Sequence, residues 1–385
     1  MLILRTEDMI YFDNAATTKP CDEAVNAVCE AMKTNWSNPS SLHGLGIKAE
    51  QVIDSSREII AKALDTDSEC IYFTSGATES NNLAIFSVAK TLGRHKKRIV
   101  TTAIEHPSVS QPIKYLEENG FEVIYISPDK SGEINPADII SAVDDNTCLV
   151  TCQLVNNETG YLLPIAKAYK AIKRLYPRVI THCDCVQGFM KLNISASSLN
   201  ADLISLSGHK IYGPKGVGAL YVKKGVRILP VNYGGGQEKG IRSGTEAVPN
   251  IAGFGAAVEA FSKSINERYE MMSELSDYLE QQIATVEGVS LNKFSERSPY
   301  IASVTVDNIK SETLLHYLEM REIYVSSGSA CSKGKKSDVL KAFGYDDKAL
   351  DTTIRLSFSH ENQKCEIDEF IKQIKNAQAE LVRIK

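Results

Sequence analysis

The sequence predicts an α/β protein: a large domain with a mostly parallel, mixed sheet flanked by helices, and a smaller α+β domain towards the C-terminus. Between residues 70 and 225, short β-rich runs alternate with amphipathic helical stretches, which is the pattern of repeated βαβ units. The β-rich runs are continuously apolar, as expected of strands covered by helices on both faces. After about residue 250, the helical stretches become longer and the strands fewer.

The expected elements follow along the chain in this order. Strands of the large domain are expected at 98–103, 121–126, 148–154, 178–184, 202–207 and 218–222, with helices between them at about 79–92, 107–119, 135–143 and 164–176. The later part predicts a long helical stretch at 247–287, strands near 300–306, 322–326 and 352–358, and helices at 311–321 and 365–383. We expect residues 15–255 to form the large domain, and residues 1–14 with 256–385 to form the small one.

Composition excludes several classes of function. The 385 residues carry a formal net charge of −5, so the chain has no general attraction to nucleic acids or membranes. No apolar run approaches the roughly 20 residues needed to cross a bilayer, and the N-terminus has no signal-peptide pattern. The nine cysteines are scattered without a CxxC pair, which indicates a reducing, cytoplasmic setting rather than a disulfide framework.

The sharpest local signal for chemistry is the stretch SLSGHKIYGPKG at 205–216, where a lysine follows a predicted strand. Ligands of α/β folds bind beyond the carboxyl ends of strands, and Lys210 stands at that point. A partly desolvated lysine has a lowered pKa and can form a Schiff base with a carbonyl group. A solvated surface lysine is the alternative reading.

A carboxylate stands at the end of another strand, in THCDCVQG at 181–188. It needs a cationic partner, and the protonated pyridine nitrogen of pyridoxal phosphate would suit Asp184 beside a Schiff-base lysine. The competing reading is a metal site that adds His182, Cys183 and Cys185. Alternation along a strand puts the two cysteines on one face and the other two residues on the opposite face, so we expect cysteines of the core and no metal site.

A phosphate site is expected where TSGATESNN, residues 74–82, turns from a strand into a helix. The backbone N–H groups of Ala77 and Thr78, with the Thr78 hydroxyl, would lie at the positive end of the helix dipole. An ordinary helix N-cap would use the same residues. The sequence has no GxxxxGK[ST] motif and no GxGxxG after a strand, so a nucleotide cofactor is weakly supported.

Two further strand ends carry polar side chains. His106, in AIEHPSV, could stack on a flat aromatic cofactor and move protons, or it could be a satisfied structural histidine. Asn157, in VNNETG, could touch a ring hydroxyl, or it could be a plain turn residue.

Two segments nearer the C-terminus suggest anion binding. Arg355 lies in the apolar strand of IRLSFSH, where an arginine suggests bidentate capture of a carboxylate or, equally, a structural ion pair. The glycine-rich segment YGGGQEKGIRSGT, which ends at Thr245, could approach a phosphate closely or could be a connector.

Cys331 lies in SSGSACSKGKK, residues 326–336, with no apolar stretch nearby to bury it. Most free cysteines behave as small buried hydrophobes, whereas this one is expected to be exposed and close to lysines. Exposure and positive charge favour the thiolate, which is the reactive form. The residue is therefore either a surface thiol or a nucleophile.

Taken together, these motifs resemble the cysteine desulfurases, which are fold-type I pyridoxal-phosphate enzymes of the class V aminotransferase group. The resemblance runs nearly end to end, through YFDNAATT, NPSSLHGLG, TSGATESNN, EHPSV, NNETG, HCDCVQ, SGHKIYGPKG, GGGQEKGIRSGT, SSGSAC and IRLS. It implies a sulfurtransferase that converts L-cysteine into L-alanine and leaves a persulfide on Cys331. The sulfur would pass to an acceptor protein, for example in iron–sulfur cluster assembly or tRNA thiolation.

The resemblance also implies roles for the matching residues. Lys210 would carry pyridoxal phosphate, His106 would stack on its ring, and Cys331 would be the nucleophile and a transient iron–sulfur ligand. The other cofactor contacts would be Asp184 at the pyridine nitrogen, Gln187 and Asn157 on the O3′ side, and Ala77, Thr78, Ser207 and His209 at the phosphate, with Thr245 supplied by the partner subunit of a homodimer. Arg355 and Asn38 would hold the substrate carboxylate.

Two other readings stay open. One is a selenocysteine lyase or another class V aminotransferase-like enzyme, in which Cys331 would be less critical. The other is a non-catalytic sulfur-relay or scaffold protein that has kept the fold.

Overall fold

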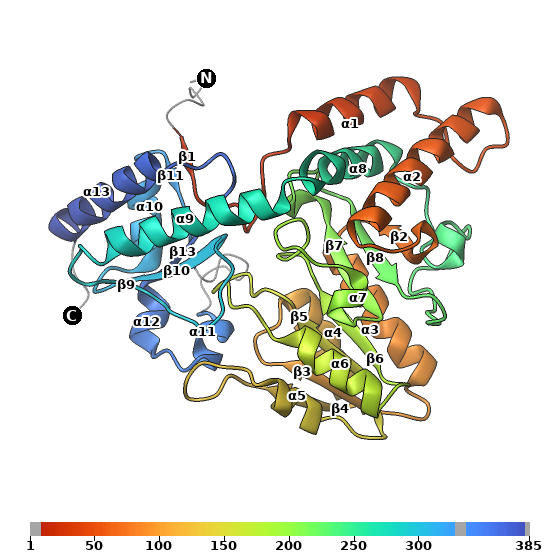
Figure 1. Ribbon diagram of the computed structural model, residues 1–385, viewed down its shortest axis with the longest axis horizontal. Coiled ribbons are helices and arrows are strands. Elements are labelled where there is room, and N and C mark those ends of the chain that lie inside the picture. Colours follow the sequence, from red (N-terminus) through yellow and green to blue (C-terminus); the bar gives the residue numbers. More distant parts are fainter. Residues whose placement is uncertain (1–8, 328–335, 382–385) are drawn as a thin grey trace.

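The computed structural model describes residues 9–327 and 336–381, which form two lobes, each built on its own sheet (Figure 1). Within these residues the larger sheet has seven strands. In the order in which they lie side by side, they are β2 (Ile71–Thr74), β8 (Gly218–Val222), β7 (Leu203–Ser207), β6 (Ile180–Asp184), β5 (Thr147–Gln153), β3 (Arg98–Thr102) and β4 (Glu122–Ile126). The strands predicted between 98 and 222 are therefore confirmed.

The larger sheet is mostly parallel, as predicted. Strands β3 to β7 run in one direction, because every neighbouring pair among them is parallel. Strand β8 is antiparallel to both of its neighbours, so β2 again runs in the common direction. The connection from β7 to β8, residues 208–217, is too short for the crossover that a parallel pair would need, and the chain turns back instead.

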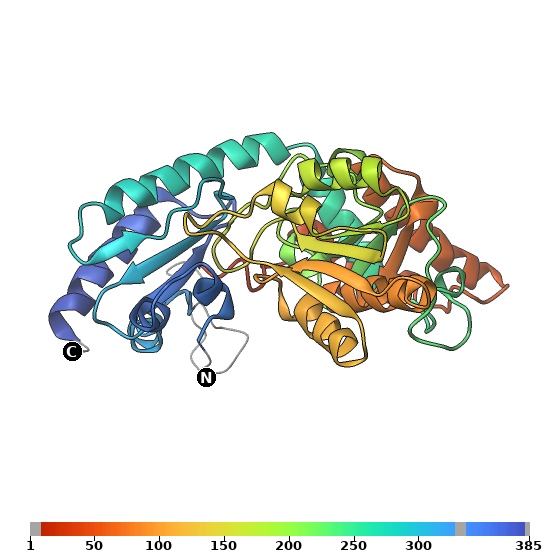
Figure 2. The same ribbon diagram turned by 90° about the horizontal axis from the view of Figure 1, so that it is seen from below.

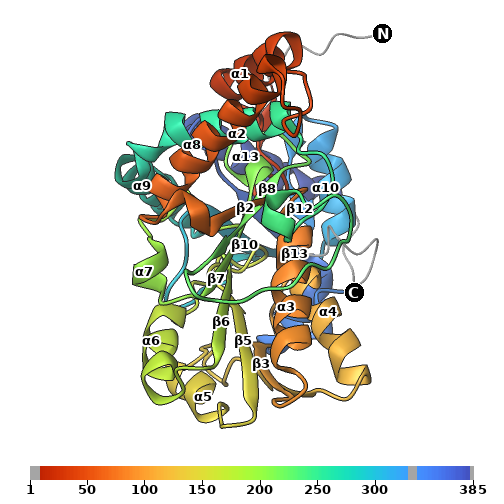
Figure 3. The same ribbon diagram turned by 90° about the vertical axis from the view of Figure 1, so that its right-hand side faces the viewer.

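Helices cover both faces of this sheet (Figure 3). Helices α3 (Ala77–Leu92) and α4 (Pro107–Glu118) lie on one face, and α5 (Pro136–Ser141), α6 (Ile165–Leu175) and α7 (Ala196–Leu199) lie on the other. Two apolar clusters result, and neighbouring strand residues divide between them: Leu149 joins the α3–α4 side, whereas Val150 joins the α6 side. This double covering explains why the strands read as unbroken apolar runs.

The helical stretch predicted at 247–287 is two helices rather than one. Helix α8 (Val248–Ser262) packs against α1 (Asp22–Thr34) and α2 (Gly44–Ala63), and α9 (Ile265–Ile283) continues towards the smaller lobe (Figures 1 and 2). At the break, Arg268 Nη1 donates to the carbonyl of Phe261 at 2.8 Å and so satisfies one of the last carbonyls of α8. The predicted domain boundary at 255/256 falls inside α8 and stays a prediction.

The smaller sheet is antiparallel. Its strands, in order, are β12 (Ser326–Ser327), β13 (Thr353–Ser357), β10 (Ile301–Val306) and β9 (Val289–Leu291), and the helices of this lobe are α10 (Ser311–Glu319), α11 (Asp338–Ala342), α12 (Asp347–Thr352) and α13 (Lys364–Glu380). The prediction of one strand at 322–326 is wrong in detail. Strand β11 (Ile323–Tyr324) pairs with β1 (Ile10–Tyr11), whereas β12 pairs with β13.

The N-terminal segment joins the two lobes. Its first residues belong to the smaller lobe, where the amide of Phe12 donates to the carbonyl of Tyr324. A few residues later, the amide of Thr18 donates to the carbonyl of His209 in the larger lobe. The segment from Ile10 to Thr18 therefore crosses between the sheets through a turn at 14–16, held mainly by backbone hydrogen bonds.

Gly218 lies in β8 between two paired residues, Thr74 of β2 and Ser207 of β7. This central position requires a glycine. A Cβ atom at Gly218 would lie 2.5 Å from the carbonyl oxygen of Leu206 and 2.8 Å from Cα of Gly76. We predict that Gly218→Ala lowers the free energy of unfolding by about 1–3 kcal/mol through overpacking, measured by urea denaturation. The control is Gly44→Ala, where a Cβ would have no atom within 4 Å; equal losses in both variants would contradict the packing argument.

Candidate active site

Five strand ends bring polar residues to one edge of the larger sheet. Strands β2, β3, β5, β6 and β7 all run towards this edge, and each is followed by one of the predicted residues. These residues are Ala77, His106, Asn157, Asp184 (the last residue of β6) and Lys210. The carboxyl edge of a parallel sheet is where α/β proteins bind ligands, so this edge is the candidate site.

Lys210 closes the short helix η2 (Gly208–Lys210) directly after β7, and it is half-buried. Its Nζ donates to the carbonyl oxygens of Ala15 and Ala16, both at 2.6 Å. The ammonium group therefore points to the N-terminal segment, which lies across the sheet edge. Backbone carbonyls hold the amine in place without neutralising its charge.

Asp184 is buried, and both of its carboxylate oxygens accept hydrogen bonds. Asn81 Nδ2 donates to Oδ2 at 2.7 Å, and the amide of Val186 donates to Oδ1 at 3.1 Å. Both contacts use the carboxylate oxygens as acceptors, and an acceptor is the group that can face a protonated pyridine nitrogen. The sequence reasoning missed Asn81; the available signal was a polar residue on the buried face of a predicted helix.

His106 is the N-cap of α4, and its ring is held by the residue two positions later. The amide of Ser108 donates to His106 Nδ1 at 3.1 Å, so a neutral imidazole carries its proton on Nε2. Burial lowers the pKa of His106; the charge of Asp184 opposes this effect and the charge of Lys210 adds to it. The ring is therefore neutral near pH 7 and holds one proton that can be moved.

The start of α3 and the end of β7 form a second part of the edge. Ser207 and Thr74 both lie opposite Gly218, which places the Ser207 hydroxyl in the same row as the entry to α3. Ser207 Oγ is buried and has no hydrogen-bond partner among the described residues. The first-turn N–H groups at Ala77 and Thr78 have no acceptor within the helix. An unsatisfied hydroxyl beside a helix N-terminus fits a phosphate group.

His209 follows β7 in η2, and Thr245 lines a pocket beside the end of β2. Burial, followed by the charges of Lys210, Lys215 and Lys191, lowers the pKa of His209 to about 4, so its ring is neutral at pH 7. Thr245 is exposed and shares a small pocket with Thr74 and Ser75. The contact of Thr245 with a phosphate in a second copy of the chain stays a prediction.

Gln187 is also buried at this edge, and its amide faces the N-terminal segment. Its Nε2 donates to the carbonyl of Ala15 at 2.9 Å, and its Oε1 accepts from Nζ of Lys191 at 2.8 Å. The carbonyl of Ala15 thus accepts hydrogen bonds from both Gln187 and Lys210. Sequence reasoning proposed Gln187 but did not identify its lysine partner.

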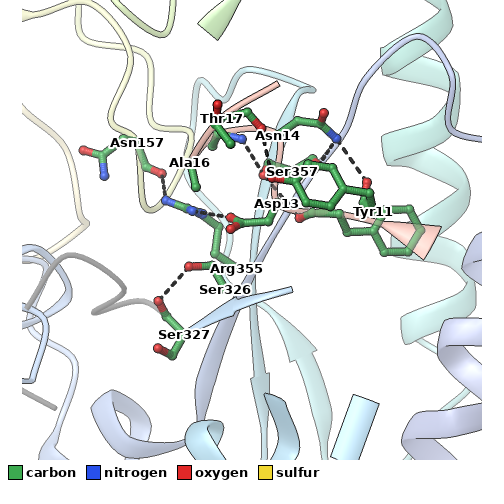
Figure 4. Close-up of polar contacts among 12 residues, drawn as sticks. Tyr11, Asp13, Asn14, Ala16, Thr17, Asn157, Ser326, Ser327, Arg355 and Ser357 are labelled. Carbon is green, nitrogen blue, oxygen red and sulfur yellow. Dashed lines mark hydrogen bonds and ion pairs between the residues drawn. The ribbon is translucent and has the colours of Figure 1, made fainter. Parts of the chain in front are cut away.

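Arg355 is buried in β13, and its guanidinium points from the smaller lobe towards the larger one (Figure 4). Nη2 pairs with Asp13 Oδ1 at 2.7 Å, and Nη1 donates to the backbone carbonyl of Asn157 at 2.9 Å. The sequence left open whether Arg355 forms a structural ion pair, and the structure shows such a pair with Asp13. Arg355 Nε is buried and has no partner in the described part of the chain, so its N–H is among the donors left for a carboxylate.

Two predicted residues are not part of this described arrangement. Asn38 lies exposed between α1 and α2, where its Oδ1 accepts from the amide of Ser40 at 2.9 Å. Its role towards a substrate carboxylate stays a prediction. Cys331 lies outside the described residues. The described chain on its N-terminal side ends beside Arg355, because Ser326 pairs with that residue across β12 and β13.

The other residues of the alternative metal site around Asp184 have contacts within the protein core. Cys183 and Cys185 are fully buried in the main apolar cluster. His182 lies between two hydroxyls, with Nδ1 2.7 Å from Thr151 Oγ1 and Nε2 3.0 Å from Ser205 Oγ. These three side chains are packed and hydrogen-bonded as parts of the core.

Comparison with known proteins identifies the family. Residues 10–370 match the family model for class V aminotransferases. The chain belongs to this family. The family and the cysteine desulfurases within it depend on pyridoxal phosphate, and the edge described above fits that cofactor through an amine, a hydrogen-bonded carboxylate and an unsatisfied hydroxyl at a helix N-terminus.

Several proteins similar to this chain carry a more specific name than that of the family. The chain is 37% identical over 368 residues to the cysteine desulfurase IscS of Methanosarcina thermophila, covering 95% of this chain and 91% of that protein. It is 36% identical to the mitochondrial cysteine desulfurase of Saccharomyces cerevisiae, covering 95% and 74%. A solved NifS-like protein superposes with a TM-score of 0.91 at 36% identity, covering 97% of this chain and all of the other.

Glu158, next to Asn157, has a raised pKa at the edge of the site. Ser337 Oγ donates to Glu158 Oε2 at 2.5 Å, and burial raises the pKa of Glu158 from 4.5 to about 7 although that hydrogen bond and Arg355 oppose the rise. A raised pKa in the folded state means that stability is full below about pH 4.5 and falls as the pH rises towards 7.

We predict that Glu158→Gln, which keeps an acceptor for Ser337, raises the free energy of unfolding by about 1–2 kcal/mol at pH 8 and leaves it unchanged at pH 4.5. Denaturant unfolding at the two pH values measures both. The control is Glu117→Gln, because Glu117 also accepts from a hydroxyl, that of Tyr125, but on the surface. A gain that is the same at both pH values would contradict burial as the cause.

Proposed function

We propose that the protein is a cysteine desulfurase, which uses pyridoxal phosphate to remove sulfur from L-cysteine and release L-alanine. The observation that supports this most is the grouping of Lys210, the Asp184–Asn81 pair and the unsatisfied Ser207 hydroxyl at one sheet edge. An amine, a carboxylate and a phosphate cradle are the three groups that this cofactor requires. The relatives named above support the choice of L-cysteine as the substrate.

The residues of the edge would hold the cofactor as follows. Lys210 would bind the aldehyde carbon, Asp184 would face the pyridine nitrogen, and His106 would lie against the ring. The remaining contacts would come from Gln187 and Asn157 near the ring oxygen, and from Ala77, Thr78, Ser207 and His209 at the phosphate, with Thr245 of a second copy. When bound, the cofactor withdraws electrons from the Cα atom of an amino acid.

The protein side chains then bind the substrate and move its protons. The Nε–H of Arg355 would donate to the substrate carboxylate, which fixes the amino acid in one orientation. The amine of Lys210 would take the proton from Cα. His106, neutral with a proton on Nε2, would donate that proton or accept another at the cofactor ring.

Cys331 would complete the reaction by taking the sulfur. Its thiolate sulfur bonds to the sulfur of the substrate while the bond from that sulfur to Cβ breaks, and the electron pair stays with the carbon. The carbon then takes a proton. One L-cysteine and one thiol therefore become one L-alanine and one persulfide, so the transfer needs no separate oxidant. We propose that the persulfide sulfur passes on to an acceptor protein of the iron–sulfur assembly or tRNA-thiolation type.

A homodimer is part of this proposal. Several large apolar side chains on and between α1 and α2 are exposed, including Met32 at 60%, Trp36 at 67% and Leu42 at 97%. Their number within this short part of the chain supports a protein–protein contact there. The described residues contain no helix that is long and apolar enough to span a bilayer. The cysteines described there are free thiols, which supports a cytoplasmic setting.

The cofactor assignment is tested by replacing the proposed amine. We predict that Lys210→Ala abolishes the visible absorbance that the purified protein shows with pyridoxal phosphate, together with alanine formation from L-cysteine. Lys215→Ala, a lysine in the next turn, should keep both. Absorbance spectra and an alanine assay measure the two effects. A Lys210→Ala protein that still forms alanine at the wild-type rate would overturn the assignment.

A further inference from the structure

One buried cation has no part in the proposed chemistry. Lys191 is 5% exposed, and no carboxylate lies within ion-pair distance of it in residues 9–327 and 336–381. Burial, followed by the charges of Lys210 and Arg355, lowers the pKa of Lys191 to about 7. A buried amine without an anionic partner destabilises the fold, so its presence calls for a reason.

A strained turn directs Lys191 into the interior. The preceding residue, Met190, has a φ of 60°, a left-handed conformation that costs a residue with a side chain about 1 kcal/mol. Nη2 of Arg268, from α9, holds the Met190 carbonyl at 2.9 Å. Two unfavourable features, a left-handed residue and a buried amine, therefore occur next to each other.

The groups that act on Lys191 come from three other elements. The charges of Lys210, at the end of β7, and of Arg355, in β13, lower its pKa, and its own charge lowers that of His209. The ring of Tyr300 lies with its centre 5.7 Å from Nζ. Lys210 and Arg355 have no acceptor atom, and the neutral His209 ring has its Nδ1 3.3 Å from Thr17 Oγ1. The side chain that does accept is Gln187, through Oε1 at 2.8 Å.

This contact fixes the direction of the Gln187 amide. With Oε1 turned to Lys191, the NH2 group points to the carbonyl of Ala15, where it donates at 2.9 Å. When Lys191 is protonated, the reversed amide would place an NH2 group against an ammonium group; in either state of Lys191 it would place a carbonyl oxygen against the carbonyl oxygen of Ala15. The same Ala15 carbonyl holds Nζ of Lys210 at 2.6 Å, so the chain of contacts runs from Lys191 through Gln187 to the proposed cofactor amine.

We propose that Lys191 is a positioning residue of this site, which locks the side-chain amide of Gln187 in the direction that the cofactor and the Ala15 carbonyl require. The inference deepens the proposed function and rests on it for the part that concerns pyridoxal phosphate. The orientation of the Gln187 amide itself is a property of the protein without cofactor. The two parts can therefore be tested separately.

The first measurement uses the protein without cofactor. In 15N-labelled protein, we expect the Gln187 side-chain N–H groups of the wild type to be protected from solvent exchange, and Lys191→Met to lower this protection tenfold or more. Lys90→Met is the control, because Lys90 Nζ also lies over a tyrosine ring, 5.3 Å from the centre of Tyr233, far from Gln187 in the sequence. Unchanged protection in Lys191→Met would overturn the proposal.

The second measurement is the affinity for pyridoxal phosphate. Lys191→Met should weaken binding by about tenfold, a loss typical of residues that support a contacting group, while Lys191→Arg, which keeps a donor, should recover part of the loss. Because a buried charge is removed, the melting temperature of the cofactor-free Lys191→Met protein should stay the same or rise. A merely structural lysine would lower it, and that result would overturn the proposal.

A double variant shows whether Lys191 acts through Gln187. Gln187→Met should weaken cofactor binding by itself, and adding Lys191→Met should then change it little. Losses that multiply in the double variant would overturn the route through Gln187. A wild-type protein that binds no pyridoxal phosphate would overturn the proposed function instead, and the exchange result on Gln187 would still decide the role of Lys191.

Discussion

The contact between Lys210 and the carbonyls of Ala15 and Ala16 is the constraint on which the site depends. These carbonyls belong to a segment that pairs with the smaller lobe at Phe12 and with the larger lobe at Thr18. The position of the amine is therefore set by both lobes at once. A shift of one lobe relative to the other would move the acceptors of Lys210, and with them the Gln187 amide that shares the Ala15 carbonyl.

Charge is distributed around this constraint in a way that suits an anionic cofactor and an amino-acid substrate. The charges of Lys210 and Arg355 both lower the pKa of Lys191, so positive charge accumulates around this amine. Two carboxylates of the site have their own partners: Asp184 accepts from Asn81, and Asp13 pairs with Arg355. The positive field that is left over favours a phosphate and a carboxylate as ligands.

The parts of the fold that follow from local pattern could be predicted. Strands covered on both faces appear as apolar runs, and the parallel order then brings the residues after those strands, such as Asp184 and Lys210, to one edge. This reasoning needs no knowledge of distant contacts. It succeeded for the larger sheet and for the residues at its carboxyl edge.

The rest depends on partners far apart in the chain. Asn81 lies 103 positions from Asp184, and Asp13 lies 342 positions from Arg355, so no local pattern links either pair. The division of 322–326 between two sheets likewise arises from pairing with β1 and β13. Lys191 is buried next to Met190, whose backbone has a left-handed conformation that could not be predicted from a methionine in the sequence.

The most direct test of the central claim follows the sulfur atom. The wild-type protein with pyridoxal phosphate is mixed with L-cysteine, its thiols and persulfides are alkylated, and the peptides are analysed by mass spectrometry. The account predicts that the peptide containing Cys331 gains the mass of one sulfur atom, and that Cys331→Ser forms neither this product nor alanine. A persulfide on another cysteine, or full alanine formation by Cys331→Ser, would contradict it.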